Sequence, residues 1–192
     1  MQARDRSPEF TQSVVASPIG PLTLVAAGGA LAGVYMDAQR HLPGTVAQAS
    51  PASQDGPDAA PLAAAASQLA EYFAGQRTEF DLPITMAGTD FQRRVWAALR
   101  EIPYGETVSY GELARELGKA SASRAVGLAN GKNPVSVIVP CHRVVGSDGS
   151  LTGYGGGLDR KRFLLDLENR VTRSRTRAPG RCRTAAASAA PR

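Results

Sequence analysis

One short stretch of the sequence carries most of its chemical potential. Pro140-Cys141-His142-Arg143 places a thiol beside an imidazole, directly after the apolar run 135–139. A thiol reacts as a nucleophile only when it is deprotonated, and an imidazole is a base that can accept its proton. The stretch therefore predicts a nucleophilic cysteine; the alternative interpretation of Cys141 is a small buried apolar residue.

The surrounding elements decide how this imidazole can act. β-branched residues dominate 135–139, which predicts a buried strand. Neighbouring side chains of an extended chain point to opposite sides, so His142 need not touch the sulfur of Cys141 directly, and a water could relay the proton. Cys–His systems also need a group that holds the imidazole in one tautomer. Glu168 is a candidate if the final helix, expected over 159–169, returns to the strand.

Cysteine and histidine usage argues against a disulfide and against a metal centre. The chain has two cysteines and two histidines, and their scattered positions do not match zinc-site spacing. Cys182 lies in an Arg-, Ala- and Ser-rich tail, so a structural disulfide is not expected. We therefore expect no metal, no cofactor and a thiol kept reduced, as in the cytoplasm.

Composition indicates a globular protein with unevenly distributed charge. No apolar run approaches the roughly 20 residues that cross a bilayer, and no apolar segment after the N-terminus suggests a secretory signal. The net charge is +5. Residues 1–87 hold four basic and eight acidic residues. Residues 88–169 hold eleven basic and nine acidic residues, and residues 170–192 hold seven arginines and no acidic residue. A polyanion should prefer the second half and the tail, although the tail is alternatively only a solvated extension.

The first half is expected to be a small α+β unit. Alternating or β-prone residues predict strands at 13–16, 22–26, 31–36 and, as a candidate, 80–84. Gly28-Gly29 marks a hairpin turn. Residues 38–60, which include the lone His41, lack a period and are expected to form a loose linker. Apolar residues at helical spacing predict a helix over 62–73, ended by Gly75.

Two capping boxes begin the helices of the second half. Thr89-Asp90-Phe91-Gln92 opens a helix whose core face includes Trp96, and Ser109-Tyr110-Gly111-Glu112 opens a short one. Ser121 is expected to cap a further short helix over 122–130. Two short helices with a Gly-containing turn between them are typical of a helix-turn-helix, although many helical hairpins do not touch DNA.

The stretch Ile138-Val139-Pro140-Cys141-His142-Arg143-Val144-Val145 resembles the active-site signature of the O6-alkylguanine-DNA alkyltransferases, here of the stand-alone bacterial type. Further motifs resemble this family at similar spacing across residues 13–169: Ser17-Pro18-Ile19-Gly20-Pro21-Leu22, Thr89-Asp90-Phe91-Gln92, Ile102-Pro103-Tyr104-Gly105, Ser109-Tyr110-Gly111, Ser123-Arg124-Ala125-Val126-Gly127, Gly131-Lys132-Asn133-Pro134 and Gly153-Tyr154-Gly155-Gly156-Gly157.

The resemblance implies an α+β fold in two parts. A small N-terminal α/β domain of ribonuclease H type would span 13–87. A mostly helical C-terminal domain with a winged-helix-like helix-turn-helix, which binds DNA and carries the catalytic site, would span 88–170. A flexible N-terminus over 1–12 and a disordered arginine-rich tail over 171–192 would flank them.

The resemblance also implies the activity. The protein would repair DNA by taking the alkyl group from O6-alkylguanine, and also from O4-alkylthymine, onto its own cysteine, once per molecule and after flipping the nucleotide out of the duplex. The implied partner is double-stranded DNA containing O6-alkylguanine. A monomer that clusters on DNA is expected, with no membrane association.

The family pattern assigns roles to individual residues. Cys141 would accept the alkyl group, His142 would act through a water, and Glu168 would orient His142. Asn133 would brace the turn before the active-site strand, and Tyr110 would donate a hydrogen bond to the base.

Other residues are implied in DNA and base recognition. Arg124 would enter the stack in place of the extruded base. Small residues would let the recognition helix enter the minor groove, with plain helix packing as the alternative: Ala122, Ser123, Ala125 and Gly127. The base pocket would be lined by Val144, through its backbone, and by Tyr154, Gly155 and Gly156.

The sequence departs from other members of this family in two ways, and two other functions compete with repair. The N-terminal unit has no cysteine and one histidine, so we expect none of the structural zinc that some members carry there. We also expect no added Cys-rich regulatory domain. Relatives that only sense lesions replace the acceptor cysteine, and Cys141 argues against that function. A helix-turn-helix regulator with an incidental thiol is the second rival.

Overall fold

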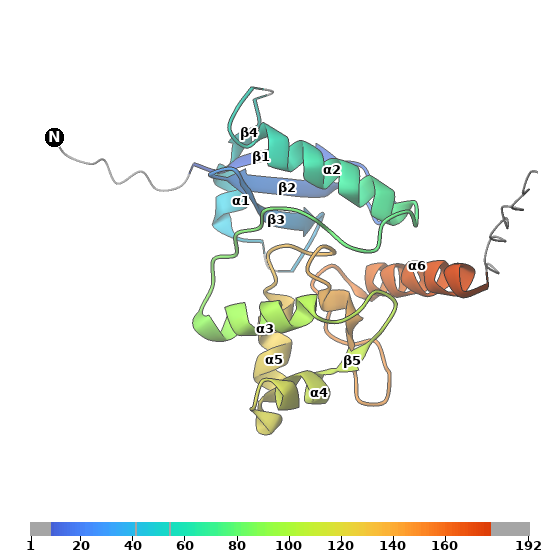
Figure 1. Cartoon of the computed structure of the whole chain (residues 1–192). Helices are drawn as coiled ribbons and strands as arrows, with labels where there is room; N and C mark the ends of the chain where they lie inside the picture. The colour runs from blue at the N-terminus through green and yellow to red at the C-terminus, as the bar shows by residue number, and fades with distance from the viewer. Residues whose placement is uncertain (1–8, 41, 54, 178–192) are drawn as a thin grey trace, which may run out of the picture.

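The computed structural model describes residues 9–40, 42–53 and 55–177. His41 and Cys182 lie outside the described residues. A four-stranded sheet forms the first half (Figure 1), in the order β3 (Ala30–Met36), β2 (Leu22–Ala27), β1 (Thr11–Val15) and β4 (Ser50–Pro51). The first three are antiparallel neighbours, and β4 pairs in parallel with β1.

The hairpin between β2 and β3 follows the sequence prediction. Gly28 and Gly29 both have positive φ, the conformation that the turn requires. The start of the sheet does not follow it. Thr11 pairs with Ala26, so β1 begins inside the segment 1–12 that was expected to be flexible.

Helices cover both faces of this sheet. α2 (Ala59–Phe73) lies along one face, as Figure 1 shows, and ends just before Gly75 as predicted. α1 (Gly44–Gln48) covers the other face, where Val46 packs with Val25 and Tyr35. The expectation of a loose linker over 38–60 was therefore partly wrong: α1 and β4 form there because apolar side chains on the second face need a cover.

The candidate strand at 80–84 does not form. Ile84 makes a single bridge to Leu31, and the Leu31 N–H bonds the Pro83 carbonyl oxygen. This isolated bridge lies beside β3 but does not extend into a ladder of paired residues.

The second half begins with α3 (Asp90–Arg100) and α4 (Tyr110–Glu116), and both predicted capping boxes are present. The Thr89 side chain accepts the Gln92 N–H while the Gln92 side chain accepts the Thr89 N–H. Ser109 and Glu112 make the same exchange at α4. Each box satisfies two N–H groups that a helix start leaves without partners.

A helix-turn-helix lies at the end of the molecule remote from the sheet (Figure 1). It consists of α4, a 3-10 turn η1 (Ala120–Ala122) and α5 (Ser123–Gly131). The predicted cap at Ser121 was wrong. The Ala122 N–H closes a tight turn onto the Lys119 carbonyl, and α5 then begins at Ser123 without a side-chain cap.

The predicted buried strand over 135–139 is a series of turns instead. All five residues are buried, but only Val135 bridges outward, to Val34 of β3. Val137 has a φ of 72°, a left-handed conformation that strand residues do not adopt. The β-branched residues of this run correctly indicated burial, but not a strand. Turns within the run satisfy its backbone groups without a sheet partner.

The last helix is longer than predicted. α6 (Leu158–Arg177) continues eight residues past Asn169 and takes in the start of the segment expected to be a disordered tail. Its last turns rest on the first half: Arg175 donates to the Gln76 carbonyl, and Gly75 lies against Val171. Residues 178–192 lie outside the described part of the chain.

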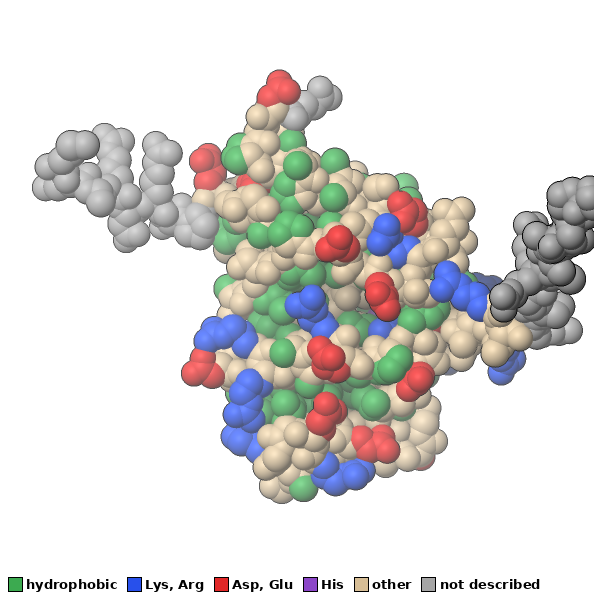
Figure 2. Space-filling model, viewed as in Figure 1, with side chains coloured by type: hydrophobic (Ala, Val, Ile, Leu, Met, Phe, Trp, Pro, Cys, Tyr) green, Lys and Arg blue, Asp and Glu red, His purple; other side chains and the backbone are tan. Residues whose placement is uncertain are grey.

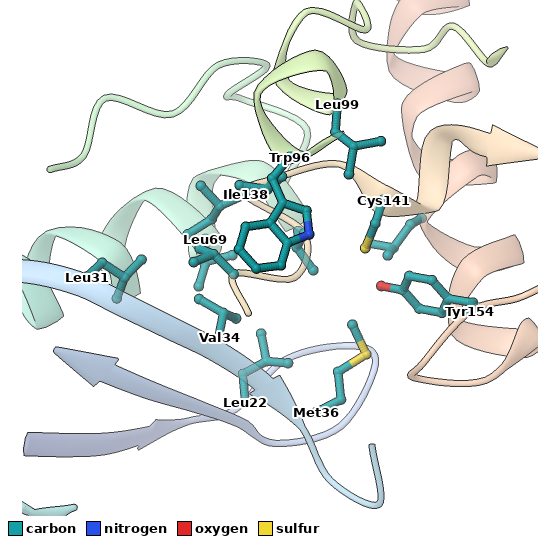
Figure 3. Packing of buried hydrophobic residues seen from close by; sticks show 14 of the residues in the cluster. Leu22, Leu31, Val34, Met36, Leu69, Trp96, Leu99, Ile138, Cys141 and Tyr154 are labelled. Atoms are coloured by element: carbon teal, nitrogen blue, oxygen red, sulfur yellow. The ribbon is translucent and has the colours of Figure 1, made fainter. Parts of the chain in front are cut away.

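One buried apolar cluster joins the two halves (Figure 3). Leu22 and Val34 of the sheet meet Trp96 and Leu99 of α3 in this cluster. Trp96 is a core residue as predicted, and its Nε1–H donates to the Ala129 carbonyl over 2.9 Å. A parallel pair of β5 (Val108–Ser109) and β6 (Val144–Val145) completes the second half.

The face seen in Figure 2 carries interspersed basic and acidic side chains over both halves. This mixture differs from the single-sign patch that long-range attraction of a polyanion uses. Within the described ranges, no helix is both long and apolar enough to span a membrane.

Candidate active site

An asparagine organises the turns that lead to Cys141. Asn133 Nδ2 donates to the Val139 carbonyl over 2.8 Å, and its Oδ1 accepts the Val135 N–H over 3.0 Å. A β-branched residue with positive φ, here Val137, costs on the order of 1–3 kcal/mol and persists only where its surroundings impose it. The amide of Asn133 bonds both ends of this turn, and thereby sets the backbone that enters the site.

Cys141 begins a 3-10 turn, η2 (Cys141–Arg143), rather than following a strand. Cys141 is 4% exposed and lies in the cluster that joins the two halves. The Asn130 amide donates to the Cys141 carbonyl over 3.3 Å. Figure 3 shows the Tyr154 hydroxyl directed toward the sulfur, with Met36 of β3 close to both.

The fold returns the last helix to the thiol, which is the condition under which Glu168 could orient His142. His142 Nε2 and Glu168 Oε1 are 2.9 Å apart, and both side chains are fully buried. The ionised carboxylate can only accept, so Nε2 carries the proton and donates it. His142 Nδ1 is then an acceptor, and it is buried without a hydrogen-bond partner among the described residues.

Glu168 also accepts hydrogen bonds from the neighbouring Arg143 and from two other segments. Arg143 donates through Nε and Nη2, each about 3.0 Å from a carboxylate oxygen. The Tyr72 hydroxyl of α2 donates to Oε1 over 2.7 Å, and the Gly105 N–H donates to Oε2 over 3.0 Å. These donors make a carboxylate in the core tolerable, since a buried charge needs partners.

The electrostatics of the site follow from burial and from this network. Hydrogen bonds and charges of His142 and Arg143 outweigh burial and lower the pKa of Glu168 to about 2. Burial lowers the pKa of His142 against the opposing pull of Glu168. Burial raises the pKa of the Cys141 thiol, while Asn133 and Lys161 act in the opposite direction. The resting site therefore holds a thiol beside a neutral imidazole.

A buried lysine ties β6 to the residue that precedes the glycine-rich loop, residues 153–157. Lys161 Nζ donates to the Val144 carbonyl over 2.5 Å and to the Thr152 carbonyl over 2.6 Å. Burial lowers its pKa to about 8, and the nearby Cys141 opposes that shift. The Val144 backbone, predicted to help to hold the base, is thus itself held by this ammonium group.

Contacts of the predicted pocket residues join the loop that carries Tyr154 to Tyr110 and to Met36. The Tyr110 hydroxyl donates to the carbonyls of Thr152 and Gly153, at 3.2 and 3.1 Å. Gly156 lies so close to Met36 that a Cβ there would be 2.2 Å from the Met36 sulfur. Tyr154 is buried, and its hydroxyl has no partner among the described residues. A side chain on Gly156 would thus close the space between the loop and β3.

The predicted DNA-contacting residues lie on α5 and its start. Arg124 and Ala125 are exposed, whereas Ala122, Ser123 and Gly127 are half-buried. Gly127 packs on the Tyr110 ring: a Cβ would be 3.7 Å from two of its carbons. This is an ordinary contact distance, so packing on Tyr110 does not by itself require glycine at position 127.

Sequence reasoning missed several residues of the site. Lys161 shares a helix face with Leu164, Leu165 and Glu168, and this spacing could have marked it as buried. Arg143 lay within the signature stretch but was given no role, and no sequence signal pointed to Tyr72, Met36 or Asn130. Their contacts depend on how the two halves meet.

No cluster of three or more His, Cys, Asp or Glu side chains suited to a metal ion occurs within residues 9–40, 42–53 and 55–177.

Comparison with known families matches both halves separately. Residues 11–86 match the family described as 6-O-methylguanine DNA methyltransferase, ribonuclease-like domain. Residues 90–170 match 6-O-methylguanine DNA methyltransferase, DNA binding domain.

Individual relatives agree with this match. The methylated-DNA–protein-cysteine methyltransferase of Mycobacterium tuberculosis is 54% identical over 152 residues, which cover 79% of this chain and 88% of the relative. That of Mycobacterium leprae is 52% identical over the same coverage. The crystal structure of Mycobacterium tuberculosis OGT in complex with DNA superposes with a TM-score of 0.76 at 50% identity, covering 85% of this chain and 94% of the other.

A ribonuclease-like half joined to a DNA-binding half, with a buried cysteine between them, defines a two-domain DNA-repair methyltransferase. The chain belongs to the 6-O-methylguanine DNA methyltransferase family. It is an enzyme of the methylated-DNA–protein-cysteine methyltransferase class, and the fold predicted from the sequence is confirmed.

Proposed function

We propose that the protein transfers the alkyl group of O6-alkylguanine in double-stranded DNA to Cys141, irreversibly and once per molecule. The observation that carries this proposal is the buried series of Cys141, His142 and Glu168, in which the His142–Glu168 bond leaves Nδ1 free to accept a proton. No other cysteine lies among the described residues.

The chemistry is a displacement at the alkyl carbon. Cys141 passes its proton to His142 Nδ1, through a water, while Glu168 holds Nε2. A lone pair of the sulfur forms the S–C bond as the C–O6 bond breaks. The electron pair of the C–O6 bond stays on the guanine. The base leaves as guanine once it has taken up one proton. A thioether has no good leaving group, so the alkylated protein does not turn over.

A base within the duplex stack cannot reach the sulfur of a cysteine that is only 4% exposed. Flipping the nucleotide out costs a few kcal/mol. Arg124, exposed in the first turn of α5, would enter the vacated space, and its guanidinium can stack on or bond to the orphaned base. Ala122, Ser123, Ala125 and Gly127 would let α5 approach the minor groove closely.

The flipped base would lie against the glycine-rich loop. Tyr110 would turn its hydroxyl from the Thr152 and Gly153 carbonyls to the base, where a donor stabilises the charge that guanine takes as it leaves. Tyr154, Gly155 and Gly156 would line the pocket beside the Val144 backbone, and Asn133 would keep the thiol aligned. O4-alkylthymine presents the same alkyl ether and is included as a substrate.

The test is the mass of the reduced protein after incubation with duplex DNA containing O6-methylguanine. We expect each molecule to gain one CH2 unit, and peptide mapping to place it on Cys141. Cys141→Ala should keep DNA binding and gain nothing. Protein that binds the lesion without any adduct would support the lesion binder or the regulator instead. The same assay with O4-methylthymine tests the second substrate.

Arg124→Ala separates flipping from chemistry in this assay. Duplex repair should slow by about tenfold or more, which corresponds to roughly 1.4 kcal/mol, while the reaction with free O6-benzylguanine is unchanged. Equal slowing on both substrates would contradict a role in flipping.

A further inference from the structure

The carboxylate of Glu168 accepts a hydrogen bond from the other half of the molecule. Tyr72 lies on α2, in the ribonuclease-like half, and its hydroxyl is 2.7 Å from Glu168 Oε1 on α6. The same oxygen accepts His142 Nε2 over 2.9 Å. All three side chains are fully buried, so solvent does not substitute for either bond.

We propose that Tyr72 is a positioning residue through which the ribonuclease-like half sets the proton affinity of His142. A carboxylate oxygen that already accepts a short hydrogen bond has less electron density to offer a second donor. Tyr72 therefore weakens the pull of Glu168 on the imidazolium form of His142 more than on the neutral form, because the charged form depends on that oxygen more strongly.

The other charged and titratable groups around His142 and Glu168 come from several elements. Arg143 of η2 bonds both carboxylate oxygens, and Tyr104 lies beside Tyr72 with its ring 5.5 Å from the Arg143 guanidinium carbon. Lys161 acts on His142, and Arg175 acts on Tyr104, through their charges. The Tyr104 hydroxyl has no hydrogen-bond partner in the described residues, so Tyr72, not Tyr104, is the tyrosine that donates to Glu168.

Tyr72→Phe is the direct test, because it removes the hydroxyl and keeps the ring that packs between Phe80 and Tyr104. Tyr35→Phe is the matched control: Tyr35 is equally a buried tyrosine of the first half, but it packs in the separate cluster with Val25 and Val46. The chain has two histidines. Imidazole-15N NMR in a His41→Gln background therefore reports His142 alone.

We expect Tyr72→Phe to raise the titration midpoint of His142 by about half a unit to one unit, the effect of one hydrogen bond on a protonation equilibrium. The imidazole 15N shifts at neutral pH should show the Nε2–H tautomer in all variants. Tyr35→Phe should leave the midpoint where it is in the His41→Gln parent.

The second readout rests on the proposed function. If neutral His142 takes the thiol proton, the acidic limb of the single-turnover methyl-transfer rate should move to higher pH in Tyr72→Phe by the same amount. A merely structural loss would lower the rate at all pH values without moving this limb. An unmoved midpoint and an unmoved limb, or a displacement to lower pH, would overturn the inference.

The two proposals fail separately. A His142 midpoint that rises in Tyr72→Phe supports the inference even if Cys141 never gains an alkyl group. An adduct on Cys141 together with identical titrations in Tyr72→Phe and Tyr35→Phe would leave the proposed function standing and remove the role of Tyr72.

Discussion

At Glu168, one carboxylate holds together three segments that are far apart in the sequence. α2 supplies Tyr72, η2 supplies His142 and Arg143, and the Gly105 N–H comes from the loop after α3. Glu168 therefore joins segments of the fold and also orients His142 for the proposed chemistry. Its removal should therefore cost stability as well as activity.

Glu168→Gln should lower the free energy of unfolding at pH 7 by about 3 kcal/mol, because it leaves the buried Arg143 without its counter-charge. The pKa of Glu168 is lowered from 4.5 to about 2. The ionised form therefore stabilises the fold above pH 4.5, and this contribution is lost as pH falls from 4.5 toward 2. Urea denaturation across this range should show less acid sensitivity in the variant.

The exposed Glu79 offers the control for that series. Glu79→Gln should change neither the free energy of unfolding at pH 7 nor its acid dependence appreciably. If Glu168→Gln unfolds with the same acid dependence as the parent, the carboxylate does not hold the network as described.

At the scale of elements, the glycine-rich loop 153–157 and the helix-turn-helix meet at Tyr110. Gly153 has a φ of 59°, and a Cβ there would be 2.9 Å from the Tyr110 hydroxyl oxygen. Gly149 also has positive φ, at 79°, but a Cβ there would meet nothing within 4 Å. These two glycines form a matched pair that separates backbone strain from displacement of the tyrosine.

Gly153→Ala and Gly149→Ala should each lose about 1–2 kcal/mol of stability from the left-handed backbone. Only Gly153→Ala should slow methyl transfer, by about tenfold if one hydrogen bond to the leaving base is lost. Thermal unfolding and single-turnover rates measure the two effects. Equal rates in the two variants would show that the Tyr110 hydroxyl does not act on the reaction.

At the scale of the whole molecule, the two halves share one core and one site. Met36 and Tyr72 reach the region of the thiol from the ribonuclease-like half, and the late turns of α6 dock back on residues 75–78. The net charge of the protein is distributed unevenly along the sequence. Residues 178–192 hold three arginines and no acidic residue.

Deleting residues 178–192 should leave methyl transfer intact and weaken nonspecific DNA binding at low salt. The cut begins at 178 because residues up to 177 belong to α6. Each phosphate contact contributes about 0.9 to the slope of log affinity against log salt, so the slope should fall by at most about 2.7. Filter-binding titrations on undamaged duplex measure this.

Substituting Arg181, Arg183 and Arg192 with Gln, at unchanged length, provides the charge control for the deletion. It should reproduce the change in salt dependence. An affinity that both variants leave unchanged at low salt would show that these arginines make no contact with phosphate.

Sequence patterns determined the elements whose signals are local. Both capping boxes, the Gly28-Gly29 hairpin and α2 form as predicted, because each depends on hydrogen bonds or packing within a few residues. The Cys141-His142 pair and its resemblance to a repair family led to the correct family. The roles of Arg124 and the other recognition residues stay predictions.

Only the tertiary structure decided the rest. The run 135–139 is as apolar as a strand, yet it turns, because Asn133 and the meeting of two halves satisfy its backbone. Residues 44–48 form α1 because Val46 buries apolar side chains on the second face of the sheet. α6 extends to Arg177 because its last turns contact residues 75–78. Tyr72 contacts Glu168 across 96 positions: periodicity cannot foresee a contact that exists only once both halves have packed.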